Sequence, residues 1–194
     1  MAAVNVEKKA AWMHAIVLLC AAVAFGVSSV FMQELVGAGS PLMVLMWFFC
    51  FLGLAKIAQP IYMMKVPRGL RPLRSWEARG DVYRKLGVPG FGALLKNTPL
   101  RLLNTQVYLS RSRRELLDVC RWVESAEAIH FWSAVVLMPY IAYCVWSGRW
   151  TALAWFVVLQ VVGNAYPIMH LRSVRGRLAP LCRRAAEAES RPAI

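Results

Sequence analysis

Four long apolar stretches constrain this chain more than any other feature of its sequence. They cover about residues 11–36, 42–64, 128–146 and 150–171. An α-helix needs roughly 20 apolar residues to cross a bilayer, and each stretch is about that long or longer. The composition agrees, because 59% of the residues are hydrophobic and 17% are charged, against about 25% charged in a typical soluble domain. The sequence therefore predicts an all-α integral membrane protein with four transmembrane helices.

The connections between these stretches predict how the helices pair. Only Gly37–Pro41 separates the first two stretches, and only Ser147–Arg149 separates the last two. Connections this short make neighbouring helices run antiparallel. We therefore expect two antiparallel helical hairpins in a single membrane domain, residues 1–194, with the long segment 65–127 between the hairpins.

The basic residues are concentrated at particular places along the chain. The formal net charge is +13, and 13 of the 23 Lys and Arg residues lie between Lys65 and Arg121. Six more follow His170, whereas the two short connections together hold one, Arg149. By the positive-inside rule, the basic segment 65–127 and both termini are expected on the cytoplasmic side. Basic blocks that flank membrane spans account for the charge without nucleic acid, which we do not expect as a partner.

The first half of the basic segment is divided into short pieces by proline and glycine. Its stretch SWEARGDVYRKLGV, residues 75–88, mixes aromatic and basic side chains. Such a mixture is typical of a surface that lies on lipid headgroups, and we expect that position for this stretch.

The second half of the basic segment carries a helix signal. Ser112 and Glu115 have the spacing of a capping box, in which each side chain accepts a hydrogen bond from a backbone N–H at the start of a helix. Further side chains then recur every three or four residues, as on one helix face. This stripe consists of Leu116, Cys120, Val123, Glu127 and His130. We expect one helix to run from the basic segment into the third span without a break.

Glu127 and His130 are the first candidate functional pair. Residues three apart on a helix are neighbours, and a carboxylate beside an imidazole raises its basicity, as in a general base. Glu124 lies one turn before Glu127, on an adjoining line of the helix. Ionisable residues at the edge of a membrane span are costly and often functional. The alternative is that Glu127 pairs with a nearby arginine while His130 only lies at the interface.

The end of the fourth stretch is the second candidate. Asn164 and Pro167 interrupt an apolar helix, and a polar residue in lipid usually faces a partner helix or a cavity. Arg172, Arg175 and Arg177 follow. Arginines on one helix face bind phosphates or carboxylates in a two-pronged geometry, which suits an anionic substrate. The alternative is a positive-inside stop signal.

The histidines are candidate metal ligands, and the cysteines are candidates for disulfides. His14, His130 and His170 are each predicted near the cytoplasmic end of a span, where they could meet. However, only one Glu-x-x-His is present and no HExxH, so we expect no metal. The five cysteines are odd in number and lack CxxC spacing, so we expect no disulfide framework. They are Cys20, Cys50, Cys120, Cys144 and Cys182.

Three motifs in order resemble one family. They are GDVYRKLGV (Gly80–Val88), ESAEAIHFW (Glu124–Trp132) and the pattern N-A-Y-P…R-x-x-R-x-R-L (Asn164–Leu178). With these motifs, roughly residues 76–181 resemble the glycosyl-4,4'-diaponeurosporenoate acyltransferases, small bacterial membrane proteins of staphyloxanthin-type carotenoid synthesis. Family members typically have Gln-Arg-Tyr-Asn-Arg where this chain has Leu171–Arg175.

The resemblance implies transfer of a fatty acyl group onto a sugar hydroxyl of a glycosylated carotenoid or a related glycolipid. The acyl donor is expected to be acyl-CoA or acyl carrier protein, with no further cofactor and with membrane lipids as partners. The expected location is the bacterial inner membrane, as a multi-pass protein with both termini in the cytoplasm.

The resemblance also implies roles for individual residues. Glu127 and His130 match the family's Glu-x-x-His signature, so His130 is expected to be the general base and Glu127 to orient it. Arg172 and Arg175 are expected to hold the anionic donor, and Asn164 to line the acceptor cleft. The remaining candidate substrate contacts are Glu124 and Arg177.

Two other interpretations remain open at this point. The chain could be a non-enzymatic membrane scaffold or lipid-binding protein whose basic face engages anionic lipids, in which case Glu127 and His130 are replaceable. It could also be a metal-dependent lipid enzyme that uses its three histidines, which requires bound metal in the purified protein.

Overall fold

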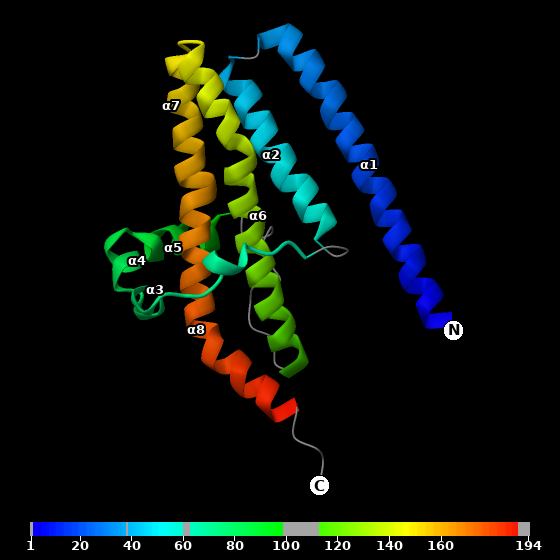
Figure 1. The fold of residues 1–194 in the computed structure, drawn as a ribbon, viewed down its shortest axis with the longest axis vertical. Coiled ribbons are helices and arrows are strands. Elements are labelled where there is room, and N and C mark those ends of the chain that lie inside the picture. The colour runs from blue at the N-terminus through cyan, green and yellow to red at the C-terminus, as the bar shows by residue number, and fades with distance from the viewer. Residues whose placement is uncertain (1, 38, 60–62, 99–112, 190–194) are drawn as a thin grey trace. The chain divides into compact units, whose positions relative to one another are not determined.

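The computed structural model contains helices and no strands in the part of the chain that it describes (Figure 1). The described residues are 2–37, 39–59, 63–98 and 113–189. Four helices are long and apolar enough to cross a membrane, which confirms the predicted all-helical chain with four membrane-length helices. Contacts divide the chain into two compact units, and each is described by itself. The first unit combines Met1–Met64 with Trp132–Asn164, and the second combines Lys65–Phe131 with Ala165–Ile194.

The membrane-length stretches differ from the predicted spans at their ends. They are Ile16–Val36, Pro41–Ala58, Leu116–Trp146 and Trp150–Ala185. The second helix ends at Ala58 rather than at residue 64. The sequence places Pro60 two residues later, and proline cannot donate the next helical hydrogen bond. The last two stretches are longer than predicted because their helices continue into the basic parts of the chain.

Helix α6 (Arg113–Trp146) is a single helix of 34 residues. It confirms the prediction that one helix joins the basic segment to the third span. Ser112 and the side chain of Glu115, the two members of the predicted capping box, lie outside the described residues.

The first unit is built on helix packing. Helix α1 (Ala2–Val36) packs on α2 (Pro41–Ala58), and α2 packs on α7 (Trp150–Leu159). The indole N–H of Trp47 donates to the Ser29 hydroxyl at 3.2 Å and ties α1 to α2. Pairing of the spans as antiparallel hairpins across a bilayer, with a cytoplasmic basic segment, stays a prediction.

The core of the first unit is apolar and aromatic. It consists of Val44, Phe48, Leu137, Tyr140, Cys144, Ala152 and Phe156. The Phe48 ring lies directly against Gly163, where a Cβ atom would overlap it. Glycine at this position therefore lets helix and ring approach closely.

Helix α7 passes through a π-helical turn, Gln160–Ala165, before α8 (Tyr166–Glu189) begins. Asn164 is buried in this turn and donates to the Gln160 side chain at 2.6 Å. Gln160 in turn donates to the carbonyl of Ala134 at 3.3 Å. A π turn is a local widening of the helix that is frequent at functional sites. At the predicted interruption the helix is therefore widened, but it continues as one stretch from Trp150 to Ala185.

The second unit packs a series of short helices onto α8. They are the 3₁₀ turn η1 (Arg68–Leu70), α3 (Ser75–Arg79), α4 (Asp81–Lys85) and α5 (Val88–Asn97). Helices α3, α4 and α5 all contact α8. Gly80 and Gly87 separate these helices with φ of 75° and 74°, a left-handed conformation that favours glycine.

Within the second unit, the N-terminal part of α6, residues 113–131, packs against α8. Their shared core consists of Val119, Val123, Leu171 and Leu178. Cys120 and Cys182 form a disulfide between the two helices, with their Cα atoms 6.8 Å apart. The expectation of no disulfide is therefore wrong for this pair. Sequence spacing could not show it, because the cysteines are brought together by helix packing across 62 residues.

Candidate functional site

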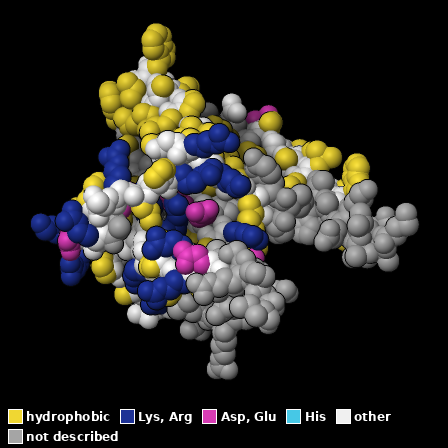
Figure 2. All heavy atoms as spheres, turned by 60° about the horizontal axis from the view of Figure 1, so that its bottom comes forward, with side chains coloured by type: hydrophobic (Ala, Val, Ile, Leu, Met, Phe, Trp, Pro, Cys, Tyr) yellow, Lys and Arg dark blue, Asp and Glu magenta, His cyan; other side chains and the backbone are white. Residues whose placement is uncertain are grey.

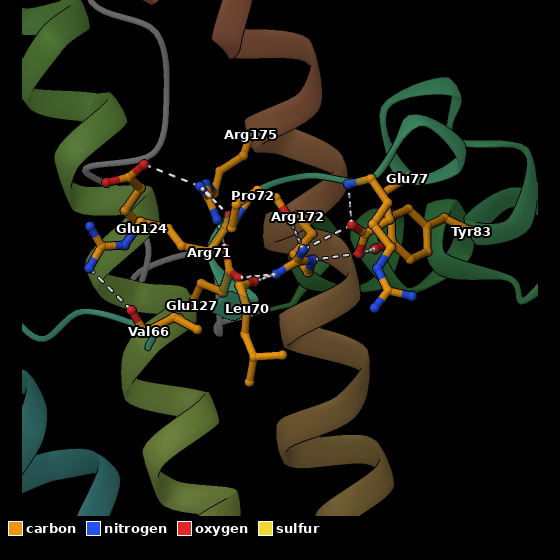
Figure 3. A network of polar contacts seen from close by, with 11 residues as sticks. Val66, Leu70, Arg71, Pro72, Glu77, Tyr83, Glu124, Glu127, Arg172 and Arg175 are labelled. Atoms are coloured by element: carbon orange, nitrogen blue, oxygen red, sulfur yellow. Dashed lines mark hydrogen bonds and ion pairs between the residues drawn. The ribbon is translucent and has the colours of Figure 1, made fainter. Parts of the chain in front are cut away.

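A network of charged side chains lies at the centre of the second unit. Figure 2 shows Lys and Arg side chains gathered around acidic ones on one face of the molecule, and Figure 3 shows the network from close by. It joins α3, α6 and α8 to the segment 66–72. Its charged members are Glu77, Glu124, Glu127, Arg172 and Arg175.

Arg172 directs all five of its N–H groups at protein acceptors. Its Nε donates to Oε1 of Glu77 at 2.6 Å, and its Nη2 donates to Oε2 of Glu77 at 2.8 Å. Nη1 donates to Oε1 of Glu127 at 2.8 Å and to the carbonyl of Leu70 at 3.0 Å. Nη2 also donates to the carbonyl of Pro72 at 3.1 Å. A guanidinium has five N–H donors, so every donor of Arg172 is used. Through these bonds Arg172 of α8 holds α3, α6 and the segment 66–72.

Glu77 accepts four hydrogen bonds in a place that solvent barely reaches, since its side chain is 6% exposed. Besides the two from Arg172, the backbone N–H of Arg74 donates at 2.7 Å and the Tyr83 hydroxyl at 2.8 Å. Burial raises the pKa of Glu77, but these hydrogen bonds and the Arg172 charge outweigh burial and lower the pKa to about 2. Burial and then the hydrogen bond to Glu77 raise the pKa of Tyr83. Glu77 is thus held as a carboxylate beside a protonated phenol.

Glu127 of α6 binds two arginines of α8, Arg172 and Arg175. Its side chain is 1% exposed, and its two oxygens accept from Arg172 and, at 2.5 Å, from Nη1 of Arg175. Nη2 of Arg175 donates to Glu124 and to the carbonyl of Arg71, each at 3.2 Å. Pairing with arginine was the alternative that the sequence left open for Glu127, and the structure shows that pairing.

Helix spacing explains why these charges meet. Glu124 and Glu127 are three apart on α6, and Arg172 and Arg175 are three apart on α8, so each pair lies on one helix face. Two acidic positions on one helix therefore face two basic positions on the other. Glu77 is the third residue of α3 and accepts from the backbone at the start of that helix, which fixes its carboxylate toward α8.

A cavity of about 240 Å³ lies against this network. Its lining includes the charged residues Arg74, Glu77, Glu127 and Arg172. The other lining residues are Val66, Gly69, Leu70, Pro72, Trp76, Phe131 and Ile168. A cavity lined by both charged and apolar side chains fits a ligand that has both a polar head and a hydrocarbon part.

His130 lies on α6, one helical turn beyond Glu127, and it precedes Phe131 in the sequence but is not itself among the residues that line the cavity. It is half-buried in the second unit. His170 is also half-buried in this unit, where its ring packs against Gly92 and Phe91 of α5. The side chain of His14 lies outside the described residues, so the convergence of three histidines stays untested. Among the described residues, no group of three or more His, Cys, Asp or Glu side chains could hold a metal ion.

Two further predicted site residues are not members of the network. Asn164 belongs to the first unit, where it is buried and bonded to Gln160. Arg177 is on α8 but is exposed, and it forms none of the ion pairs of the network. Of the predicted residues, the structure therefore brings Glu124, Glu127, Arg172 and Arg175 together.

The sequence analysis did not predict Glu77, which forms the bidentate ion pair with Arg172. The helices α3 and α4 of the stretch 75–88 pack on α8, and the position of this stretch on lipid headgroups stays a prediction. One signal was present, because Glu77 and Asp81 are the only acidic residues among the many basic ones of residues 65–98. An isolated acid in a basic stretch is a candidate for a buried ion pair.

Comparison with known proteins supports one family. Residues 67–184 match the glycosyl-4,4'-diaponeurosporenoate acyltransferase family, and this range contains the whole charged network. No curated protein and no solved structure shows a significant match to the chain. The match covers more than half of the chain, and the chain therefore belongs to the glycosyl-4,4'-diaponeurosporenoate acyltransferase family.

Proposed function

We propose that this protein transfers a fatty acyl group from a thioester donor onto a sugar hydroxyl of a glycosylated carotenoid or related glycolipid, at the membrane. The observation that carries the proposal is the cavity lined by both charged and apolar side chains, of which all but Val66 lie in the range that matches the family. A glycolipid acceptor has both kinds of surface, a polar sugar and a hydrocarbon body. Four membrane-length helices suit an acceptor that is dissolved in lipid.

The proposed general base is His130. Glu77 is a poor base, because its pKa of about 2 means that it hardly binds a proton near neutral pH. Both oxygens of Glu127 are engaged by arginines. An imidazole titrates near neutral pH, as a general base requires. His130 is one turn from Glu127 and adjacent to Phe131 of the cavity wall, and it matches the family's Glu-x-x-His signature.

The proposed reaction is a direct acyl transfer. The sugar hydroxyl oxygen attacks the thioester carbonyl carbon while the hydroxyl proton moves to the His130 imidazole. A carbon–oxygen bond forms and the carbon–sulfur bond breaks. The proton then passes from His130 to the departing thiolate, so the products are an ester and a free thiol, and the enzyme is unchanged.

We propose different roles for the two arginines of the network, Arg172 and Arg175. Arg172 has all five N–H groups bound to protein, so we propose it as a positioning residue that fixes Glu77 and Glu127 in the cavity wall. Arg175 keeps its Nε outside the hydrogen bonds of the network and is the one proposed to face the anionic donor. Asn164 as an acceptor contact, Glu124 and Arg177 as further contacts, and the two possible donors remain part of the proposal.

The test is mass spectrometry of lipid extracts from producing cells. Wild type, a deletion strain and a strain with His130→Ala are compared at equal protein level. Deletion and His130→Ala are both expected to lose one lipid and to accumulate a precursor lighter by one acyl group. His14→Ala is the matched control, since it also removes one imidazole from the chain, and it is expected to retain the product.

Two results would contradict the proposal. If His130→Ala makes the acylated lipid at the wild-type level, His130 is not the base. If deletion changes the lipids but none loses an acyl group, the protein is a membrane scaffold or lipid-binding protein instead. In that case, removing arginines one at a time should act additively through charge.

A further inference from the structure

A second cavity in the same unit shares one residue, Arg175, with the proposed reaction. It is an open hollow of about 450 Å³. It is lined by Arg68, Arg71, Pro72, Leu73, Arg175 and Ala179. Half of these residues are arginines and none is acidic, in contrast to the first cavity, where Glu77 and Glu127 face Arg172.

The arginines of this hollow keep most of their hydrogen-bonding capacity. Arg71 uses Nη2 for the carbonyl of Val66 at 3.2 Å, and within the described part of the chain its other N–H groups have no acceptor. Arg68 is exposed and forms no hydrogen bond or ion pair with the described residues. Arg172, by comparison, has no donor left. The capacity to bind an anion therefore lies at Arg68 and Arg71, which sequence reasoning did not select, and not at Arg172.

Hydrogen bonds within the protein hold two of the arginines that line the hollow. Arg71 is half-buried, its side chain is tied to Val66, and its own carbonyl accepts from Arg175 at 3.2 Å. Arg175 is held in turn by Glu127 and Glu124. Two of the three guanidinium groups are thus fixed in place before a ligand arrives, which reduces the entropy lost on binding.

The chemistry of the lining indicates the ligand. Guanidinium groups form bidentate hydrogen bonds with phosphate oxygens. Pro72, Leu73 and Ala179 add apolar surface to the same lining. The volume lies in the range of about 300–1,000 Å³ that small-molecule sites occupy. A ligand that combines phosphate with a less polar chain fits this lining.

The position of the hollow links it to the proposed reaction. Pro72 lines both cavities, and Arg175 of the hollow bonds to Glu127 of the first cavity. We infer that the hollow formed by Arg68, Arg71 and Arg175 binds the phosphate of the phosphopantetheine arm that carries the acyl thioester. This inference rests on the proposed function, because it names the donor class for that reaction. Phosphopantetheine occurs in coenzyme A and on acyl carrier protein, and the hollow recognises what the two share.

The test is equilibrium binding to the purified full-length protein in nonionic detergent, measured by calorimetry. The probes are 4'-phosphopantetheine, pantetheine, which differs from it by the phosphate alone, coenzyme A, and acyl carrier protein with and without its phosphopantetheine arm. Phosphopantetheine is expected to bind at least tenfold more tightly than pantetheine, since hydrogen bonds to charged groups are strong, and coenzyme A or the loaded carrier is expected to bind as well. Whichever of the two binds identifies the source of the arm.

The variants locate the site. Arg68→Ala combined with Arg71→Ala is expected to weaken binding of the phosphate-bearing probe at least tenfold. Arg79→Ala combined with Lys85→Ala is the matched control, because it removes two exposed positive charges from the same unit, and it should change binding less than twofold. Arg68→Ala alone removes no hydrogen bond to the described residues, so it is the variant expected to disturb the fold least, and a loss of about threefold or more is expected for it.

Several outcomes would overturn the inference. One is equal binding by wild type and the Arg68/Arg71 double variant. Another is an equal loss in the control, which would mean diffuse charge attraction. A third is arginine-dependent binding of phosphatidylglycerol vesicles without binding of any phosphopantetheine probe, which would assign the hollow to a lipid headgroup.

Binding also separates this inference from the proposed function. His130→Ala should bind coenzyme A or the loaded carrier as wild type does, although it transfers no acyl group. If His130→Ala still transfers the acyl group while the arginine variants lose binding, the proposed base is wrong and the donor site stands. If His130→Ala loses transfer while the arginine variants bind normally, the donor site is wrong and the proposed base stands.

Discussion

Arg172 and Glu77 are 95 residues apart in the sequence and form a bidentate ion pair, with N···O distances of 2.6 and 2.8 Å. Both side chains are nearly buried, at 13% and 6% exposure. The pair fixes α3 onto α8, and the remaining Arg172 donors fix the segment 66–72 and α6. The charged lining of the first cavity therefore depends on one guanidinium group.

The Arg172→Lys variant tests this dependence. Lysine keeps the charge but has three donors on a single nitrogen, so it cannot reproduce the two-pronged pair or satisfy both carboxylates and both carbonyls. We expect the free energy of unfolding to fall by about 2–3 kcal/mol, because buried acceptors lose their partner. Thermal unfolding of the purified protein in detergent measures the change.

Arg84→Lys is the control for this variant. Arg84 pairs with Asp81, and both side chains are more than half exposed, at 73% and 58%. Exposed pairs contribute little, so a change below about 0.5 kcal/mol is expected. Equal effects of the two variants would show that the Arg172 network does not hold the second unit together.

Acid should weaken the fold through Glu77. Its pKa in the folded protein, about 2, lies below the ordinary value of 4.5, so the folded state favours the carboxylate. The resulting stabilisation is fully present above pH 4.5 and is lost as the pH falls from 4.5 through 2. Its size is of the order of 3 kcal/mol, at about 1.4 kcal/mol per pKa unit. Melting temperatures from pH 7 to pH 2.5 follow the loss.

Glu77→Gln separates this effect from the titration of other carboxylates. The variant should be less stable than wild type at pH 7, and the difference between the two should shrink below pH 4.5. A difference that stays constant down to pH 2.5 would contradict the lowered pKa of Glu77.

Gly92→Ala tests the contact between α5 and α8. A Cβ atom at Gly92 would lie 2.8 Å from Cε1 of His170, so the ring must move or the helices must separate. We expect a loss of about 1–3 kcal/mol, as for other overpacked sites. Gly90→Ala is the matched control on the same helix, because nothing lies within 4 Å of its added Cβ. Alanine there should be neutral or stabilising by up to about 1 kcal/mol.

Reduction of the Cys120–Cys182 disulfide should destabilise the second unit. The bond closes a loop of 62 residues, for which chain entropy gives up to about 4 kcal/mol. A reductant should lower the melting temperature of wild type and leave that of Cys120→Ser unchanged. Cys50→Ser is the control, since Cys50 is a free thiol, and it should keep the response to reductant.

Thiol alkylation in intact cells tests which side of the membrane this pair occupies. The positive-inside rule predicts the cytoplasmic side, where thiols are kept reduced. Cys120 and Cys182 are then expected to be alkylated in cells and to form the disulfide after isolation in air. A disulfide already formed in growing cells would contradict the predicted orientation.

Much of the fold was predictable because its signals are local. Hydropathy over about 20 residues gave the four membrane-length helices, and the stripe that ends at His130 gave the continuous helix α6. A departure from the regular helix at Asn164 was predictable for the same reason. The end of α2 and the lengths of α6 and α8 were less accurate, since helices continue past the membrane wherever packing supports them.

The class of protein, the helical segments and the separate clusters of charge follow from the order of the amino acids, because each depends on neighbouring residues. Which charges meet depends instead on how the helices pack in space. Glu127 has both His130 and several arginines within reach in principle, and helix packing brings it Arg172 and Arg175 from 45 and 48 residues away. The same packing saturates Arg172 with protein acceptors and leaves donors on Arg68 and Arg71. A hydrogen-bond partner depends on position in space, which residue types and spacing along one helix do not determine.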